Sequence, residues 1–251
     1  MSSPPDSLAT ERFWREYWQT HDPVQEVGRD FYFASLLDRA LARSNARSFL
    51  ELGGYPGHFA VYVAKRFGLA ATLLDSYVDR DVVERLLARN GLAAEDVTVI
   101  EEDMFAAEPR QRYDVVLSAG LLEHFLDLER VLKRHLDFLA PGGILVVTVP
   151  NYRGVNGRLQ ARFDPAHLAA HNLEAMDPER LRELLVGLGL EAVEVGYYGR
   201  FRVWLEDLGR RPPPVRATVY AIQALGLPLD LVGFRSRWTS PHVAAVARAR
   251  P

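Results

Sequence analysis

The sequence predicts an α/β domain built on a largely parallel β-sheet, and two observations support this. Short β-rich runs alternate with amphipathic segments from residue 47 to about residue 195, a pattern typical of βαβ units. Most of these runs are continuously apolar, as expected of strands that are covered by helices on both faces. The predicted strands are 48–52, 71–74, 97–100, 114–117, 144–149 and 192–197, with 243–246 as a last short strand.

Amphipathic segments between the strands predict helices at 57–67, 79–89, 127–139 and 177–187. The last of these has a clear start signal, because Asp177 suits the cap position and Pro178 suits the first helical position. Upstream, residues 8–44 carry apolar and aromatic side chains near helical spacing, which predicts two helices that pack over the sheet. We therefore expect an N-terminal helical cap over 1–44 and the main domain over 45–251.

The segment 205–240 is an insertion before the last strand. It contains three consecutive prolines, 212–214, which we expect to exclude helix and to form an extended spacer. The stretch that follows them predicts one helix, because its apolar positions recur with few charges between them. This helix packs either on its own domain or on a second subunit in a homodimer, or else it forms part of a substrate pocket.

Composition and charge exclude several kinds of partner and site. The 251 residues carry 30 basic and 33 acidic side chains, so the broad positive surface that non-specific nucleic-acid binding requires is missing. The absence of cysteine excludes disulfides, thiolate zinc sites and cysteine nucleophiles. The opening MSSPPDS has no signal-peptide pattern, and the apolar stretch 215–233 is interrupted by Arg216, Pro228 and Asp230, so we expect no membrane span and a cytoplasmic protein.

The most informative segment is a glycine-rich turn between the first predicted strand and the helix after it, Glu51-Leu52-Gly53-Gly54-Tyr55-Pro56-Gly57. Such a turn lets a ligand approach bare backbone. It lacks the GK[ST] ending of a phosphate-binding loop, and its glycines do not have the GxGxxG spacing of dinucleotide-binding folds. On its own, the turn is equally compatible with a tight strand-to-helix connection in any α/β domain.

Acidic residues recur where the next two strands end. Asp75 follows the second predicted strand and Asp103 ends the third, so that with Glu51 three acids stand at carboxyl ends of strands, where open α/β sheets bind ligands. Carboxylates only accept hydrogen bonds, and S-adenosylmethionine (SAM) offers matching donors. Its ribose diol suits Asp75, its adenine amine suits Asp103 and its α-amino group suits Glu51.

The motifs ELGGYPGHF, LLD, EEDMF, YDVVLSAGLLEHF and LAPGGILVVTVPN occur in an order that resembles the class I SAM-dependent methyltransferases over about residues 45–200. The resemblance implies SAM as the cofactor and a Rossmann-like sandwich with a mostly parallel seven-stranded sheet whose last strand is antiparallel. It places Glu51, Gly53 and Gly57 on the family's (D/E)xGxGxG motif. Tyr55 stands where the middle glycine is usual, with Gly54 beside it, so we expect the Tyr55 side chain to touch the methionine end of the cofactor or to cover it from solvent.

The same resemblance assigns the rest of the cofactor site. It implies that Asp75 binds the ribose, that Asp103 binds the adenine amine and that Met104 packs on the adenine ring. The segment Ser118-Ala119-Gly120 matches the part of the family that lies along the methionine and opens toward the methyl acceptor.

Two histidines are candidates for a role in catalysis. His124 follows the fourth predicted strand, and His171 lies in the connection after the fifth. Either can act as a general base if the acceptor is an alcohol or phenol, although methyl transfer can also proceed by alignment of the reactants alone. His167 and His171 have the i, i+4 spacing of two-histidine metal sites, but no HExxH motif surrounds them, and we assign no metal.

These observations predict methyl transfer from SAM to a small-molecule acceptor, preferably to oxygen, in secondary metabolism or on a sugar or lipid precursor. We expect three additions to select the acceptor, namely the N-terminal helices, the loop 151–175 and the insertion 205–240, and no (D/N)PPY tetrapeptide of amino-nitrogen methylation is present. One alternative is an NAD(P)-dependent oxidoreductase, which the glycine spacing and the lack of a Tyr-x-x-x-Lys pair disfavour. The other is a catalytically inactive SAM-binding partner subunit, which Tyr55 suggests.

Overall fold

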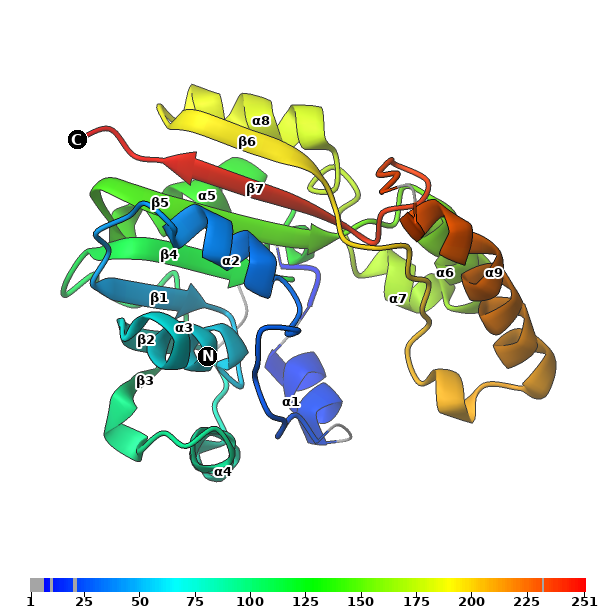
Figure 1. The fold of residues 1–251 in the computed structure, drawn as a ribbon, viewed down its shortest axis with the longest axis horizontal. Helices are drawn as coiled ribbons and strands as arrows, with labels where there is room; N and C mark the ends of the chain where they lie inside the picture. Colours follow the sequence, from blue (N-terminus) through cyan, green and yellow to red (C-terminus); the bar gives the residue numbers. More distant parts are fainter. Residues whose placement is uncertain (1–6, 10, 20–21, 232) are drawn as a thin grey trace.

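The sheet is the centre of the computed structural model, which describes residues 7–9, 11–19, 22–231 and 233–251. Within these residues, seven strands form one sheet in the order β3-β2-β1-β4-β5-β7-β6 (Figure 1). The strands are β1 (Ser48–Leu52), β2 (Ala70–Asp75), β3 (Val97–Glu101), β4 (Tyr113–Ala119), β5 (Leu139–Pro150), β6 (Glu191–Tyr198) and β7 (His242–Arg248). β7 pairs antiparallel with both of its neighbours. The predicted strands and the antiparallel last strand are therefore confirmed.

Helices cover both faces of this sheet. They are α1 (Glu11–Gln19), α2 (Ala34–Leu41), α3 (His58–Phe67), α4 (Arg80–Arg89), α5 (Leu128–Phe138), α6 (Val155–Phe163), α7 (Pro165–Ala169), α8 (Pro178–Gly187) and α9 (Pro213–Leu231), with short 3₁₀ turns η1 (Ala94–Asp96), η2 (Leu122–His124) and η3 (Leu208–Arg210). The four helices predicted between strands are confirmed as α3, α4, α5 and α8. Asp177 caps α8 as expected, because its side chain accepts a hydrogen bond from the Glu179 N–H.

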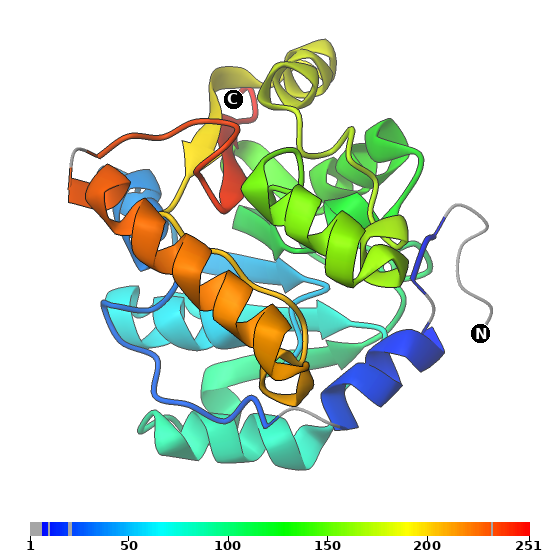
Figure 2. The ribbon, with the colours of Figure 1, turned by 90° about the vertical axis from the view of Figure 1, so that its right-hand side faces the viewer.

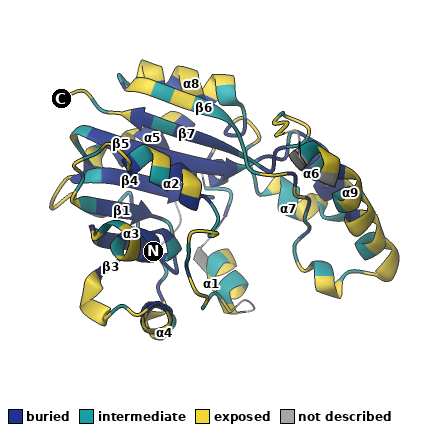
Figure 3. Ribbon diagram, viewed as in Figure 1, coloured by how far each residue is buried: buried dark blue, intermediate teal, exposed yellow. Residues whose placement is uncertain are grey.

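The core lies in two layers, one on each side of the sheet. Along β4, Val115 and Leu117 pack with α2 and α3, whereas Val116 packs with α5 and α8. Side chains of a strand alternate between its two faces, so a continuous apolar run supplies both layers at once. Figure 3 shows the resulting pattern, in which the central strands are buried, whereas the edge strand β6 and the outer helix faces are exposed or partly exposed.

The N-terminal region contributes to one of these layers. Leu36 and Leu37 of α2 belong to the same buried cluster as Phe49 of β1. The boundary between residues 44 and 45 stays a prediction, and residues 1–6, which bear on the signal-peptide expectation, lie outside the described residues, as do 10, 20–21 and 232. In the described part of the chain, none of the helices has both the length and the apolar character to span a bilayer.

The expectation of an extended spacer at the prolines 212–214 is wrong. α9 begins at Pro213, and the N–H groups of Val215 and Arg216 both donate to the Pro212 carbonyl, at 3.0 and 3.2 Å. Proline is accepted in the first turn of a helix because its missing N–H would have no partner there. The rule against proline applies to the helix interior, not to its start.

α9 packs on α6 of its own chain. Val219 of α9 lies in a small buried cluster with Leu159 of α6 and with Phe201. Together α6, α7 and α9 form an acceptor-side lobe beyond the carboxyl ends of the parallel strands (Figures 1 and 2). The outer face of α9 leaves Tyr220 and Leu225 exposed at 62% and 79%, and the homodimer stays a prediction.

His135 of α5 is fully buried beneath the sheet. Its Nδ1 is 2.8 Å from the Val131 carbonyl oxygen, and its Nε2 is 2.8 Å from the Ser118 hydroxyl oxygen. A carbonyl only accepts, so Nδ1 donates and Nε2 accepts the Ser118 proton. Burial lowers the pKa of His135 to about 4, so the ring is neutral at pH 7.

We expect His135 to make the fold less stable in mild acid. The unfolded chain takes up a proton near the ordinary pKa of 6.5, but the folded chain does so only near 4, so between these values lower pH favours unfolding. The stability advantage of wild type over His135→Gln should shrink by on the order of 2 kcal/mol between pH 7 and pH 5. Urea unfolding at the two pH values measures this, and an advantage that is constant with pH contradicts it.

Candidate functional site

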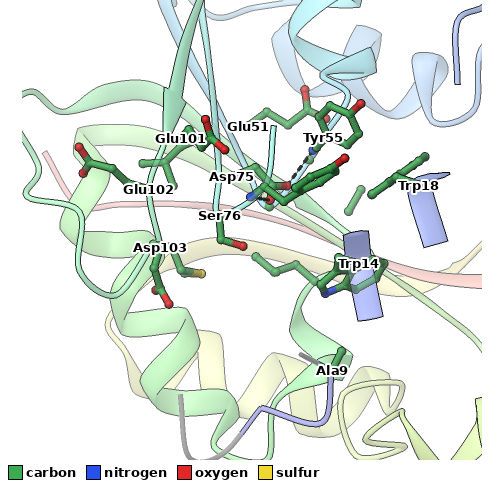
Figure 4. Close-up of a pocket in the computed structure, with 18 of the residues that line it drawn as sticks. Ala9, Trp14, Trp18, Glu51, Tyr55, Asp75, Ser76, Glu101, Glu102 and Asp103 are labelled. Atoms are coloured by element: carbon green, nitrogen blue, oxygen red, sulfur yellow. Dashed lines mark hydrogen bonds between the residues drawn. The ribbon is translucent and has the colours of Figure 1, made fainter. Parts of the chain in front are cut away.

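A cavity of about 340 Å³ opens at the carboxyl ends of β1, β2, β3 and β4 (Figure 4). This is where the strand order reverses between β1 and β4, the usual ligand position in an open α/β sheet. Its volume is within the roughly 300–1,000 Å³ of small-molecule sites. The predicted cofactor residues that line it are Glu51, Gly53, Gly54, Tyr55, Asp75, Asp103, Met104, Ala119 and Gly120.

The glycines of the β1–α3 turn are required by the shape of the backbone and by Glu51. Gly53 has φ 59°, in the left-handed region that disfavours side chains. A Cβ on Gly54 would lie only 2.2–2.5 Å from atoms of the Glu51 carboxyl-bearing side chain. The turn therefore passes directly over this acid, which leaves room for backbone alone.

Glu51 is buried beneath the turn. Its Oε2 accepts a hydrogen bond of 2.7 Å from the Ala60 N–H, in the first turn of α3. Burial raises the pKa of Glu51 to about 8, although the backbone hydrogen bonds from Ala60 and Phe59 oppose this shift. One oxygen of the acid is thus engaged with the helix, and binding of a ligand amino group by Glu51 stays a prediction.

Asp75 lies at the centre of the cavity floor, at the end of β2. Its Oδ2 accepts from the Tyr55 N–H at 2.9 Å, and its Oδ1 accepts from the Tyr77 N–H at 3.1 Å (Figure 4). Burial raises the pKa of this carboxyl to about 6. The two backbone bonds fix the orientation of the carboxylate, and each oxygen keeps a further lone pair for a donor such as a ribose hydroxyl.

The loop after β3 supplies the opposite wall. Oδ1 of Asp103 accepts from the Phe105 N–H at 2.7 Å, and the Met104 carbonyl accepts from the Arg134 side chain. Met104 is buried. A polar carboxylate and an apolar thioether therefore stand side by side, which suits an aromatic ring that carries an amine.

Two predicted residues are placed elsewhere. Ser118 does not line the cavity, because its hydroxyl is directed into the core and bonds His135. Gly57 caps the start of α3 with φ 99°, and a Cβ on it would lie 3.2 Å from the Leu73 side chain. Their positions in the motif agree with the resemblance, but their contacts here are structural.

Helix α1, one of the N-terminal helices expected to select the acceptor, forms a wall of the cavity itself. Trp14 and Trp18 line the cavity, and the Trp18 ring packs edge-on against Tyr55 at a centroid distance of 5.3 Å. Tyr55 packs in turn on Tyr77 at 5.4 Å. The aromatic cluster of residues 13–18 was the available signal, but an apolar helix face does not reveal which surface it covers.

We expect Tyr55→Gly to change SAM affinity by less than about tenfold, or about 1.4 kcal/mol. The bond from residue 55 to Asp75 comes from the main chain and survives the substitution, while the lost ring is 6% exposed and sits between Trp18 and Tyr77. Calorimetric titration with SAM measures the change, and a circular dichroism spectrum controls for folding. Abolished binding in a folded variant would show that the turn is aligned wrongly with the family motif.

The two candidate catalytic histidines lie together beside the cavity but do not line it. The rings of His124 and His171 are 4.7 Å apart between centroids. The edge-on contact of Trp14 with His124, at 4.9 Å, joins them to the cavity wall. Burial lowers the pKa of His124 to about 3 and that of His171 to about 4, so both are neutral at pH 7.

Comparison with known proteins identifies the same family. The family described as "Methyltransferase domain" matches residues 27–195. Trans-aconitate 2-methyltransferase of Mycobacterium tuberculosis is 28% identical over 201 residues, 79% of this chain and 68% of the relative. A ubiquinone biosynthesis O-methyltransferase of Bradyrhizobium sp. is 33% identical over 88 residues, 34% of this chain and 33% of the relative.

Solved structures of methyltransferases share the fold. Phosphoethanolamine N-methyltransferase 2 of Haemonchus contortus, in complex with S-adenosyl-L-methionine, has a TM-score of 0.58 at 17% identity over 86% of this chain, which spans about half (52%) of that protein. A putative sarcosine dimethylglycine methyltransferase from Galdieria sulphuraria has a TM-score of 0.58 at 18% identity, with 95% of this chain and 97% of that chain covered.

The family match covers more than half of the chain and decides against the NAD(P)-dependent oxidoreductase that the sequence left open. The order of the motifs, the sheet with its antiparallel β7 and the matching family all agree. The chain therefore belongs to the class I SAM-dependent methyltransferases.

Proposed function

We propose that this methyltransferase transfers the methyl group of SAM to an oxygen atom of a small, partly apolar acceptor. The observation that carries the proposal is the pair of neutral histidines next to the cavity wall at Trp14, of which His124 is buried and His171 half-buried. A hydroxyl acceptor loses its proton as the methyl group arrives, and a neutral imidazole can take up that proton.

The strand order supports one orientation of the cofactor in the cavity. Asp103 follows β3, Asp75 ends β2 and Glu51 lies on β1, so adenine, ribose and methionine occupy successive strand ends. The next strand along is β4, which ends at Ala119 and Gly120, both of which line the cavity. In this arrangement the sulfonium methyl group is directed toward the end of β4, where η2 carries His124.

Aromatic side chains next to the acceptor-side lobe pack near the same histidines, with Tyr152 after β5 and Trp204 after β6. The Tyr152 ring lies 5.0 Å from that of His171 and 5.8 Å from that of Trp204. Flat aromatic walls suit an apolar or ring-shaped acceptor. The names of two relatives, a trans-aconitate methyltransferase and a ubiquinone biosynthesis O-methyltransferase, support a small-molecule acceptor, and the second supports oxygen.

The proposed step is an in-line displacement. A lone pair of the acceptor oxygen forms a bond to the methyl carbon, the carbon–sulfur bond breaks, and its electron pair stays on sulfur to give neutral S-adenosylhomocysteine. The hydroxyl proton passes to the imidazole. The enzyme supplies a large part of the rate by holding oxygen, methyl and sulfur in line.

A set of acceptors with one carbon skeleton tests the choice of atom. Aromatic rings that differ only in a hydroxyl, carboxyl or amino group are incubated with SAM, and S-adenosylhomocysteine and the methylated product are measured by mass spectrometry. We expect turnover with the hydroxyl or carboxyl compounds. Methylation of the amines alone overturns the proposal, and the absence of turnover in a protein that binds SAM favours the inactive partner subunit.

A further inference from the structure

Three donor groups converge next to the cavity, on the far side of Trp14. Glu123 and His124 come from η2, and His171 follows α7. One ligand atom from each of the three lies within 4.8 Å of the others. Two imidazoles and a carboxylate from separate parts of the chain are thus brought to a single point.

Among the residues that the structure describes, both histidines leave the same ring nitrogen, Nε2, without a hydrogen-bond partner. Nδ1 of His124 is 3.1 Å from the Ala170 carbonyl oxygen, and Nδ1 of His171 is 2.7 Å from the His167 carbonyl oxygen. Because a carbonyl only accepts, each Nδ1 carries the proton and each Nε2 keeps a lone pair. Histidines that ligate metals are oriented in this way, with the second ring nitrogen donating to a carbonyl or carboxylate.

Glu123 is the strongest indication that something positive belongs at this point. Its side chain is 1% exposed. Within the described residues, its Oε2 has no hydrogen-bond partner although it is shielded from solvent. A buried carboxyl group without a partner is costly to the fold, and a cation at this oxygen would remove that cost.

The neighbouring pair at i, i+4 spacing is a poorer candidate. Nε2 of His167 lies 3.0 Å from the Tyr152 hydroxyl, which can donate to it. His167 is therefore already engaged, whereas Nε2 of His171 is available. The structure consequently replaces the sequence pair His167 and His171 by a set from two segments.

We propose that Glu123, His124 and His171 bind one divalent first-row transition-metal ion, of which Zn²⁺ is the natural probe. Two imidazoles with one carboxylate form a ligand set typical of catalytic Zn²⁺, with an open position for a further oxygen, whereas Mg²⁺ and Ca²⁺ prefer oxygen ligands alone. The ligand atoms of a tetrahedral ion stand roughly 3.4 Å apart at metal–ligand distances of about 2.1 Å. Binding therefore draws the three side chains slightly inward.

The role of this ion rests on the proposed function. An acceptor hydroxyl in the open position would become more acidic, as water does on Zn²⁺. The proton could then leave without a strong base, and His124 and His171 would act as ligands of the ion. The binding site itself does not depend on which atom is methylated.

Direct metal titration tests the site. Protein freed of metal by chelation is titrated with Zn²⁺ in a calorimeter, and the visible absorption of bound Co²⁺ reports nitrogen and oxygen ligands in a distorted field. We expect one ion per chain and at least a tenfold loss of Zn²⁺ affinity in Glu123→Gln and in His171→Gln, in line with the roughly 10–100-fold that even second-shell changes cost. His167→Gln, a histidine of the same cluster outside the ligand set, should bind Zn²⁺ as wild type does.

Several outcomes overturn the site. They are no Zn²⁺ or Co²⁺ binding by wild type, wild-type affinity in folded Glu123→Gln and His171→Gln, and loss of binding in His167→Gln. Circular dichroism identifies unfolded variants. The Co²⁺ spectrum of wild type tests for an ion with nitrogen and oxygen ligands without any variant. If the protein binds Zn²⁺ at this site but methylates only amines, the metal site stands and the proposed function is wrong. If it methylates oxygen but binds no Zn²⁺, the proposed function stands and the metal site is wrong.

Discussion

We expect replacement of His124 or His171 with glutamine to lower methyl transfer by about a hundredfold or more and to leave SAM affinity nearly unchanged. Neither side chain lines the cofactor cavity, so the ground-state contacts of SAM are preserved. The loss is confined to the step in which the acceptor gives up its proton, where general bases typically contribute 10²–10⁴. The same result follows whether the two imidazoles take the proton themselves or hold a cation that acidifies the acceptor.

Turnover at saturating SAM and calorimetric SAM affinity together measure this effect. The deficit should shrink at high pH, where a phenolic acceptor ionises without help. Near-normal turnover in both variants on the true acceptor would mean that the enzyme works by alignment and desolvation of the reactants alone.

We expect replacement of Asp75 with alanine to weaken SAM binding ten- to a hundredfold. This loss would reflect charge-assisted hydrogen bonds to the ribose diol worth about 1.5–3 kcal/mol. Asp75→Asn removes the charge but also one of the two oxygens that accept the backbone N–H bonds from Tyr55 and Tyr77, so a circular dichroism spectrum of each variant controls for folding.

Calorimetric titration measures the affinities of wild type and of both Asp75 variants for SAM, S-adenosylhomocysteine and NAD(P)H. Asp96→Ala serves as the matched control, since Asp96 also accepts a backbone hydrogen bond, from the Ala93 N–H at 2.7 Å, but lies outside the cavity. Unchanged SAM affinity in a folded Asp75→Ala protein removes Asp75 from the cofactor site.

The fold was predictable from sequence wherever a local signal had one interpretation. The run Ser48–Leu52 is mostly apolar and is followed by a glycine, and β1 has these bounds. The start of α9 was missed because three prolines were judged by their effect inside a helix, whereas Pro213 and Pro214 lie in its first turn.

The site was predictable only for residues that stand at the carboxyl ends of strands. Asp75 and Asp103 meet in the cavity because carboxyl ends of parallel strands share one edge. Trp18 was missed because its place depends on how α1 packs. Glu123 was missed because its importance comes from its burial beside His171, a residue distant in the chain, and no local pattern records such a contact.

Trp14 gives the two halves of the enzyme a common wall. Its side chain lines the cavity, and its ring also contacts His124, next to the proposed acceptor position. Sites that share a side chain are not independent, because a shift of that ring caused by one ligand changes the surface offered to the other. Such coupling is reciprocal. If bound cofactor changes the affinity for the acceptor by some factor, bound acceptor changes the affinity for the cofactor by the same factor. We therefore expect helix α1, through Trp14, to make the affinity for the acceptor depend on whether SAM or S-adenosylhomocysteine occupies the neighbouring cavity.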